Sequence, residues 1–174
     1  TYQRLKADNP ALHAVLSLRH PPDDESAALL ARLPDVHRID ADSAALMSAS
    51  DALLLASGTI TLEAALLARP MVVAYRVHPV SAAIARALRL LKINRFSLPN
   101  LLAGADIVPE CMQEDCNPPR LAAELAPLLT NAPAADAQRA ALAAVAAQLP
   151  ANVSARAADA ITAQFCLNEV RTTP

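Results

Sequence analysis

Glycine and aromatic residues are both scarce in this chain of 174 residues. It holds 2 glycines, 2 tyrosines, 2 phenylalanines and no tryptophan. Average glycine usage of about 7% would give roughly a dozen glycines, so each glycine present marks a place where the backbone leaves little choice. With 54% hydrophobic residues and 2% aromatics, the composition favours an alanine-rich α/β or α protein. It disfavours a β-sandwich, which needs more aromatic and β-branched residues.

The sequence also lacks the segments that would direct it into or across a membrane. No uncharged apolar run approaches the roughly 18–20 residues of a membrane span. The first residues have neither an initiator methionine nor the apolar stretch of a signal peptide. They are instead typical of a helix interior, so we expect the chain to be a fragment or an excised domain. The three cysteines, Cys111, Cys116 and Cys166, show no metal-ligand spacing, and we expect free thiols in a reducing cytoplasm.

Acidic residues are missing from one block of the chain, between Ala64 and Ala105. Six cations fall in this block: Arg69, Arg76, Arg86, Arg89, Lys92 and Arg95. Since the net charge of the whole chain is −2, the remainder carries −8. A local cationic block in a mildly acidic protein indicates an anionic ligand or surface at one place. Nucleic-acid binding would want a basic domain with aromatic stacking residues, so we expect no nucleic-acid partner.

Short apolar segments alternate with helical ones along most of the chain. We predict strands at residues 12–18, 36–39, 52–56, 71–75 and 93–98. We predict helices at residues 1–9, 26–33, 44–50, 61–68, 80–92, 120–129, 134–149 and 154–169. Strands that alternate with helices pair in parallel, so the expected fold is α/β: a Rossmann-like, doubly wound parallel sheet with helices on both faces, ending in alanine-rich helices.

The turn Ser57-Gly58-Thr59 joins the predicted strand 52–56, which looks central, to the predicted helix 61–68. Ligands of doubly wound sheets bind beyond the carboxyl ends of the strands. Free backbone N–H groups and the positive end of the helix dipole at such a turn suit phosphate. The alternative is a plain helix start that is capped by the hydroxyls of Thr59 and Thr61.

Several motifs follow one another around this turn. They are Ala49-Ser50-Asp51-Ala52, Ala56-Ser57-Gly58-Thr59-Ile60-Thr61-Leu62-Glu63-Ala64, Pro70-Met71-Val72-Val73-Ala74-Tyr75-Arg76, Ser97-Leu98-Pro99-Asn100-Leu101-Leu102-Ala103-Gly104 and, more loosely, Val108-Pro109-Glu110 with Gln113-Glu114. Through these motifs the sequence closely resembles the lipid-A-disaccharide synthases, densely over residues 48–129. One departure is Ala74, where many members of that family have glycine.

The resemblance implies half of a two-domain glycosyltransferase of the GT-B type. Residues 1–130 would be the nucleotide-sugar donor-binding domain without its first strand, and residues 131–174 would pack across domains or subunits. The implied reaction condenses UDP-2,3-diacylglucosamine with 2,3-diacylglucosamine 1-phosphate, with inversion, and gives lipid A disaccharide 1-phosphate and UDP. The resemblance implies no cofactor and no metal. The acceptor site and the catalytic base would lie in the other half, so we expect no catalytic residue in this chain and no activity from it alone.

Six residues are the candidates for donor binding. The resemblance implies that Ser57-Gly58-Thr59 holds the diphosphate, and Glu63, one helical turn later, can accept the ribose hydroxyls. Arg76 follows the strand 71–75 directly and can neutralise phosphate. Asn100 can hydrogen-bond uracil or the sugar. The plainer alternatives are a solvated glutamate, a surface arginine and an asparagine that caps a helix.

The basic residues Arg86, Arg89, Lys92 and Arg95 have two interpretations. Charge runs are usually solvated helix faces. An enzyme of acylated substrates must also reach a bilayer, and each basic side chain near an anionic surface is worth about 1 kcal/mol. The second interpretation predicts a peripheral protein at the cytoplasmic face of the bacterial inner membrane.

Other functions stay open from the sequence alone. A non-catalytic nucleotide-binding or assembly module could keep the fold and lack an acceptor domain. A UDP-sugar epimerase-like enzyme shares the architecture, although the Ser97–Gly104 motif belongs to the synthases. The family is further expected to form homodimers through C-terminal elements, which suits the alanine-rich tail.

Overall fold

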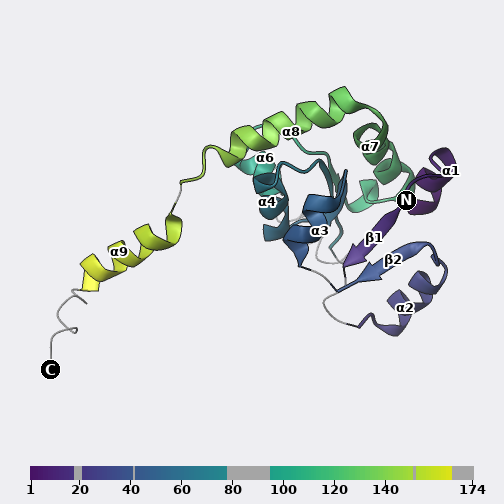
Figure 1. Ribbon diagram of the computed structural model, residues 1–174, viewed down its shortest axis with the longest axis horizontal. Helices are drawn as coiled ribbons and strands as arrows, with labels where there is room; N and C mark the ends of the chain where they lie inside the picture. The colour runs from purple at the N-terminus through teal and green to yellow at the C-terminus, as the bar shows by residue number, and fades with distance from the viewer. Residues whose placement is uncertain (18–20, 41, 78–94, 151, 166–174) are drawn as a thin grey trace, which may run out of the picture.

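Parallel strands and helices alternate through the computed structural model, which describes residues 1–17, 21–40, 42–77, 95–150 and 152–165 (Figure 1). The strands are β1 (Ala14–Ser17), β2 (Val36–Ile39), β3 (Leu53–Ala56), β4 (Met71–Tyr75) and β5 (Glu110–Met112). The helices are α1 (Tyr2–Asp8), α2 (Asp24–Ala31), α3 (Ser43–Ala49), α4 (Thr59–Leu66), α6 (Leu98–Ala103), η1 (Gln113–Asp115), α7 (Pro118–Thr130), α8 (Ala132–Ala146) and α9 (Val153–Phe165). The predicted α/β class is confirmed.

The strands fall into two hydrogen-bonded sets. β1 pairs with β2, and the second set has the order β3-β4-β5; every pair is parallel. Among the described residues, no ladder joins the two sets. The expectation of parallel strands therefore holds, but β3 is an edge strand of its set and β4 is the central one. The register from Leu53↔Met71 to Ala56↔Ala74 brings the carboxyl ends of β3 and β4 side by side.

β4 is the most buried strand because helices cover both of its faces. Successive side chains of a strand point to opposite faces. Met71 and Val73 pack with residues of α4 and α8, whereas Val72 packs with residues of α1 and α7. A strand that is buried on both sides reads as a continuous apolar run, which explains why the predicted bounds of β4 match the observed ones.

The strand predicted at residues 93–98 is wrong over its described part. Residues 95–97 form no strand, and α6 begins at Leu98. Ser97 is the N-cap residue of α6, Pro99 lies in its first turn, and Gly104 ends it with a φ of +64°. A serine followed by proline favours a helix start, and a left-handed glycine favours a helix end. The fifth strand lies later, at Glu110–Met112; residues 93–94 and the helix predicted at 80–92 lie outside the described residues.

α8 packs against the core that α4, β3 and β4 form. Its Leu142 packs into the cluster of buried residues beneath β3 and β4, and its buried Gln138 accepts a hydrogen bond of 2.6 Å from the backbone N–H of Met71. α8 therefore packs on the elements that precede residue 131. α9 differs, since it extends away from the rest of the fold (Figure 1). Within the described residues, no helix has both the length and the apolar character that a membrane span needs.

Candidate functional site

The turn between β3 and α4 is built on a backbone conformation that only glycine adopts readily. Gly58 has a φ of +154° and is the N-cap residue of α4. A Cβ atom at this position would meet no heavy atom of the described residues within 4 Å. The requirement for glycine therefore comes from the backbone and not from crowding. As far as the described residues go, the space beside Ser57-Gly58-Thr59 is open, and we call these residues the open turn.

The start of α4 has no side-chain cap. The hydroxyl of Thr61 donates to the Gly58 carbonyl over 2.7 Å, and the hydroxyl of Ser57 donates to the Phe96 carbonyl over 3.1 Å. The alternative of a helix start capped by the hydroxyls of Thr59 and Thr61 is thus wrong. Among the described residues, the first N–H groups of α4 have no side-chain acceptor. They lie at the positive end of the helix dipole, an arrangement that suits an anion.

Glu63 lies on the exposed side of α4, one turn after Thr59. Its neighbours Ala64 and Ala65 are buried against the sheet. Within the described residues, its carboxylate has no hydrogen-bond or ion-pair partner. Residues four apart share one face of a helix, so the carboxylate is available on the same face as the open turn.

Arg76 follows β4 and is therefore at the same sheet edge as the turn after β3. Its side chain is exposed, and its Nη2 donates to the carbonyl of Cys116 over 2.9 Å and more weakly to that of Gln113 over 3.4 Å. The side-chain amide oxygen of Gln113 accepts from the Val77 N–H over 3.1 Å. η1 thus braces the segment after β4. The sequence contained Gln113 within a family motif but carried no signal of this role.

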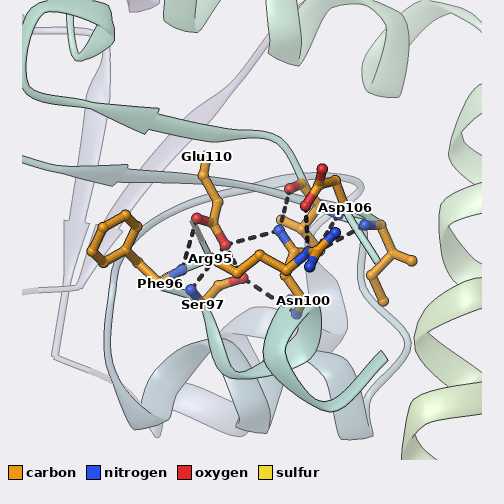
Figure 2. Close-up of polar contacts among 8 residues, drawn as sticks. Arg95, Phe96, Ser97, Asn100, Asp106 and Glu110 are labelled. Carbon is orange, nitrogen blue, oxygen red and sulfur yellow. Dashed lines mark hydrogen bonds and ion pairs between the residues drawn. The ribbon is translucent and has the colours of Figure 1, made fainter. Parts of the chain in front are cut away.

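Asn100 is buried and its side chain is bound to protein groups (Figure 2). Its side chain is 1% exposed. Its Oδ1 accepts from the N–H groups of Ile107 and Val108, both over 2.9 Å, and its Nδ2 donates to the Val108 carbonyl and to Glu110 Oε1, both over 2.8 Å. An asparagine amide offers two donors and two acceptor sites, so protein groups use its whole hydrogen-bonding capacity. In this structure the Asn100 side chain therefore has no free polar atom for the expected contact with uracil or sugar.

Glu110 is the central residue of the same network (Figure 2). Its Oε2 accepts from the Phe96 N–H over 2.9 Å. Its Oε1 accepts from the N–H and the hydroxyl of Ser97, over 2.9 and 2.6 Å, and from Asn100. The sequence placed Glu110 in a loosely matching motif without a role, because nothing local shows that these donors converge on it.

Arg95, a member of the cationic block, forms an ion pair. Its Nε lies 2.6 Å from Oδ1 of Asp106, the first acidic residue after the block, and the two side chains are 34% and 75% exposed. Arg95 therefore makes an ion pair at the surface in this structure. Arg86, Arg89 and Lys92 lie outside the described residues.

A hollow of about 680 Å³ lies between the loop before β5, α7 and α8, and it shares no residue with the open turn. It is lined in part by Cys111, whose pKa is raised by burial and further by the negative charge of Glu124. A thiol with a raised pKa stays protonated at neutral pH and is a poor nucleophile. No group of three or more metal-ligating side chains occurs in the described part of the chain. The open turn, Glu63 and Arg76 therefore form the better candidate site.

Comparisons with known proteins agree with the motifs. A family model described as lipid-A-disaccharide synthetase matches residues 1–165. The lipid-A-disaccharide synthase of Xylella fastidiosa (strain M23) is 49% identical over 125 residues, which are 72% of this chain and 32% of that protein. The synthase of Xanthomonas euvesicatoria pv. vesicatoria (strain 85-10) is 47% identical over 125 residues, 72% of this chain and 28% of that protein. The chain thus spans about a third of the length of the curated relatives it matches.

Proposed function

The chain belongs to the lipid-A-disaccharide synthetase family, and we propose that it is the donor-binding half of a glycosyltransferase of that family. The complete enzyme would join UDP-2,3-diacylglucosamine to 2,3-diacylglucosamine 1-phosphate and release UDP. The observation that carries this proposal is the start of α4 at Gly58, which has no side-chain cap, with the carboxylate of Glu63 unpaired beside it among the described residues. An anion-binding helix start next to a free carboxylate suits a nucleoside diphosphate, which has phosphates at one end and ribose hydroxyls in its middle.

Each residue has a distinct part in the proposed site. The N–H groups at the start of α4 and the Thr59 hydroxyl bind the diphosphate, and Glu63 accepts the ribose hydroxyls. The guanidinium of Arg76, which donates to the carbonyl of Cys116 just after η1, offsets the phosphate charge. Ser57 holds the turn through its bond to Phe96, and Asn100 is left out of the site because its polar atoms are already bound.

The reaction would proceed by direct displacement at C1 of the donor sugar, which inverts that centre. A base from outside this chain would take the proton of the acceptor hydroxyl. The positive start of α4 and Arg76 would stabilise the charge that builds on the departing UDP. The residues of this chain therefore act on the leaving group, and the chain alone is expected to transfer nothing.

The donor domain comprises more of the chain than its first 130 residues. α8 supplies Leu142 to the core, so we place it in this domain with β1 to α7. The separation of the β1-β2 pair from the β3-β4-β5 set supports the expectation of a further strand from outside this chain. In doubly wound sheets the first strand lies between the two halves.

Nucleotide binding tests the proposed function directly. Calorimetry with the full chain should show UDP binding with a Kd on the order of 1 mM, equivalent to about −4 kcal/mol, and weaker binding of uracil or uridine, which lack the diphosphate. Absence of UDP binding would contradict the proposal. Disaccharide formation by this chain alone would contradict the assignment of the base to another half, and conversion of a UDP-sugar to its epimer would favour an epimerase.

The cationic block is the proposed contact with the anionic inner membrane on its cytoplasmic side. We expect the chain with Arg86, Arg89 and Lys92 changed to alanine to sediment less with vesicles that contain phosphatidylglycerol, because three basic side chains contribute about 1 kcal/mol each. The double variant Arg95→Ala/Asp106→Ala is the matched control and should change sedimentation little, because it removes an ion pair and leaves the net charge unchanged. Equal sedimentation of the triple variant and the unchanged chain would remove the membrane proposal.

α9 is the proposed contact in a homodimer. It extends away from the rest of the fold (Figure 1), and its Val153 and Ile161 are 58% and 52% exposed. We expect the full chain to have about twice its mass of 18.3 kDa in light scattering, and a chain that ends at Pro150 to be monomeric. Ile161→Glu should act like the truncation without shortening the chain. A monomeric full chain, or a truncated chain that remains dimeric, would contradict this role of α9.

A further inference from the structure

We infer that Glu110 is a positioning residue for the turn Ser57-Gly58-Thr59, an inference that rests on the proposed donor site. Glu110 is at the start of β5, and its hydrogen bonds connect it to the turn through the segment Phe96-Ser97. It touches no atom of the proposed nucleotide. Its role is to hold in place the Phe96 carbonyl, which accepts the hydrogen bond from Ser57.

The first step is the attachment of Phe96-Ser97 to Glu110 (Figure 2). One carboxylate oxygen accepts from the Phe96 N–H over 2.9 Å, and the other accepts from the Ser97 N–H and hydroxyl over 2.9 and 2.6 Å. Ser97 is fully buried. Two successive peptide N–H groups bound to one carboxylate fix both the position and the orientation of this segment.

The second step is the attachment of the turn to Phe96. The Phe96 carbonyl accepts the Ser57 hydroxyl over 3.1 Å, across 39 positions of sequence. Phe96 is therefore bound to Glu110 through its N–H and to the turn through its carbonyl. A shift of Phe96 moves the acceptor of Ser57, the residue that directly precedes Gly58.

The network around residue 110 requires a carboxylate. Four donor groups converge on the two oxygens of Glu110. An ionised carboxylate offers about four acceptor sites and no donor, whereas a glutamine amide has an NH₂ group that would face at least one of these donors. Glu110→Gln therefore keeps the size of the side chain and breaks part of the network. Because hydrogen bonds to a charged group are about twice as strong as neutral ones, the carboxylate also holds the segment firmly.

A double-mutant cycle in the full chain separates positioning from a general structural role. UDP affinity is measured by calorimetry for Glu110→Gln, for Ser57→Ala and for the double variant. We expect each single variant to bind UDP about fivefold to tenfold more weakly, the loss typical of one hydrogen bond. The double variant should be no weaker than the weaker single variant, because both changes detach the same turn. The control cycle pairs Glu110→Gln with Thr59→Val, whose losses should multiply, because Thr59 would contact the phosphate directly.

The outcomes are distinguishable. Unchanged UDP affinity in Glu110→Gln, or losses that multiply with Ser57→Ala, would overturn the positioning role while the proposed function stands. If the unchanged chain binds no UDP, the proposed function and this inference fall together. If Glu110→Gln does not fold, Ser97→Ala takes its place. It removes the hydroxyl contact of 2.6 Å to Glu110 together with the longer N-cap contact of 3.5 Å from the Asn100 N–H, and the same cycle with Ser57→Ala then decides.

Discussion

Changing Glu63 to alanine is expected to weaken UDP binding by about 10- to 100-fold. A carboxylate that accepts both ribose hydroxyls makes two hydrogen bonds to a charged group, each worth about 1.5–3 kcal/mol before the loss of hydration is counted. The same change should leave the melting temperature nearly unaltered. Glu63 is exposed on α4, its carboxylate has no partner among the described residues, and alanine favours a helix more than glutamate does.

Calorimetry with UDP and with 2′-deoxy-UDP gives the sharpest form of this test. The unchanged chain should prefer UDP, and Glu63→Ala should bind both nucleotides equally weakly, because the group that distinguishes them has been removed. Glu25→Ala is the matched control, since Glu25 is also an exposed helical glutamate, in the first turn of α2. Retention of the preference for UDP in Glu63→Ala would show that Glu63 does not contact the ribose.

Changing Asn100 to alanine is expected to lower the free energy of unfolding by about 3–5 kcal/mol. The variant loses four hydrogen bonds of 2.8 to 2.9 Å and leaves buried N–H and carbonyl groups of the loop before β5 without partners. Each unsatisfied buried group costs about 1–3 kcal/mol. Losses above about 4 kcal/mol are exceptional among single substitutions and indicate a broken buried network.

Urea unfolding measures this effect, and Asn131→Ala is its control. Asn131 is an exposed asparagine that caps α8 through one bond of 3.3 Å, so its loss should cost only about 1 kcal/mol. The two interpretations of Asn100 predict opposite patterns. If Asn100 has a structural role, Asn100→Ala lowers the free energy of unfolding, and the protein that remains folded still binds UDP. A ligand contact would lower UDP affinity and leave stability near that of the unchanged chain.

Local patterns in the sequence predicted much of the fold. The bounds of β2 and β4 agree with the prediction, and the other helices and strands, apart from β5 and the short helices α6 and η1, deviate by one to three residues where described. Gly58 was also identifiable, because a rare glycine between an apolar strand and a helix marks a turn that other residues do not adopt. The wrong prediction of a strand at residues 93–98 also has a local cause. Phe96 and its apolar neighbours match a strand, but Ser97 and Pro99 start a helix there.

The sequence by itself determined the α/β class, the glycine turn and, through its motifs, the family. These depend on short-range properties: side-chain periodicity, backbone freedom and residue order. Only the tertiary structure decided the roles of Asn100, Glu110 and Arg95, each a polar residue whose partner groups come from other elements. No pattern in the sequence near Glu110 indicates that the N–H groups of Phe96 and Ser97 donate to it. Nor does any indicate that the Phe96 carbonyl accepts a hydrogen bond from Ser57 across 39 positions. Whether a polar side chain binds a ligand or the protein itself depends on which groups folding brings within about 3 Å of it.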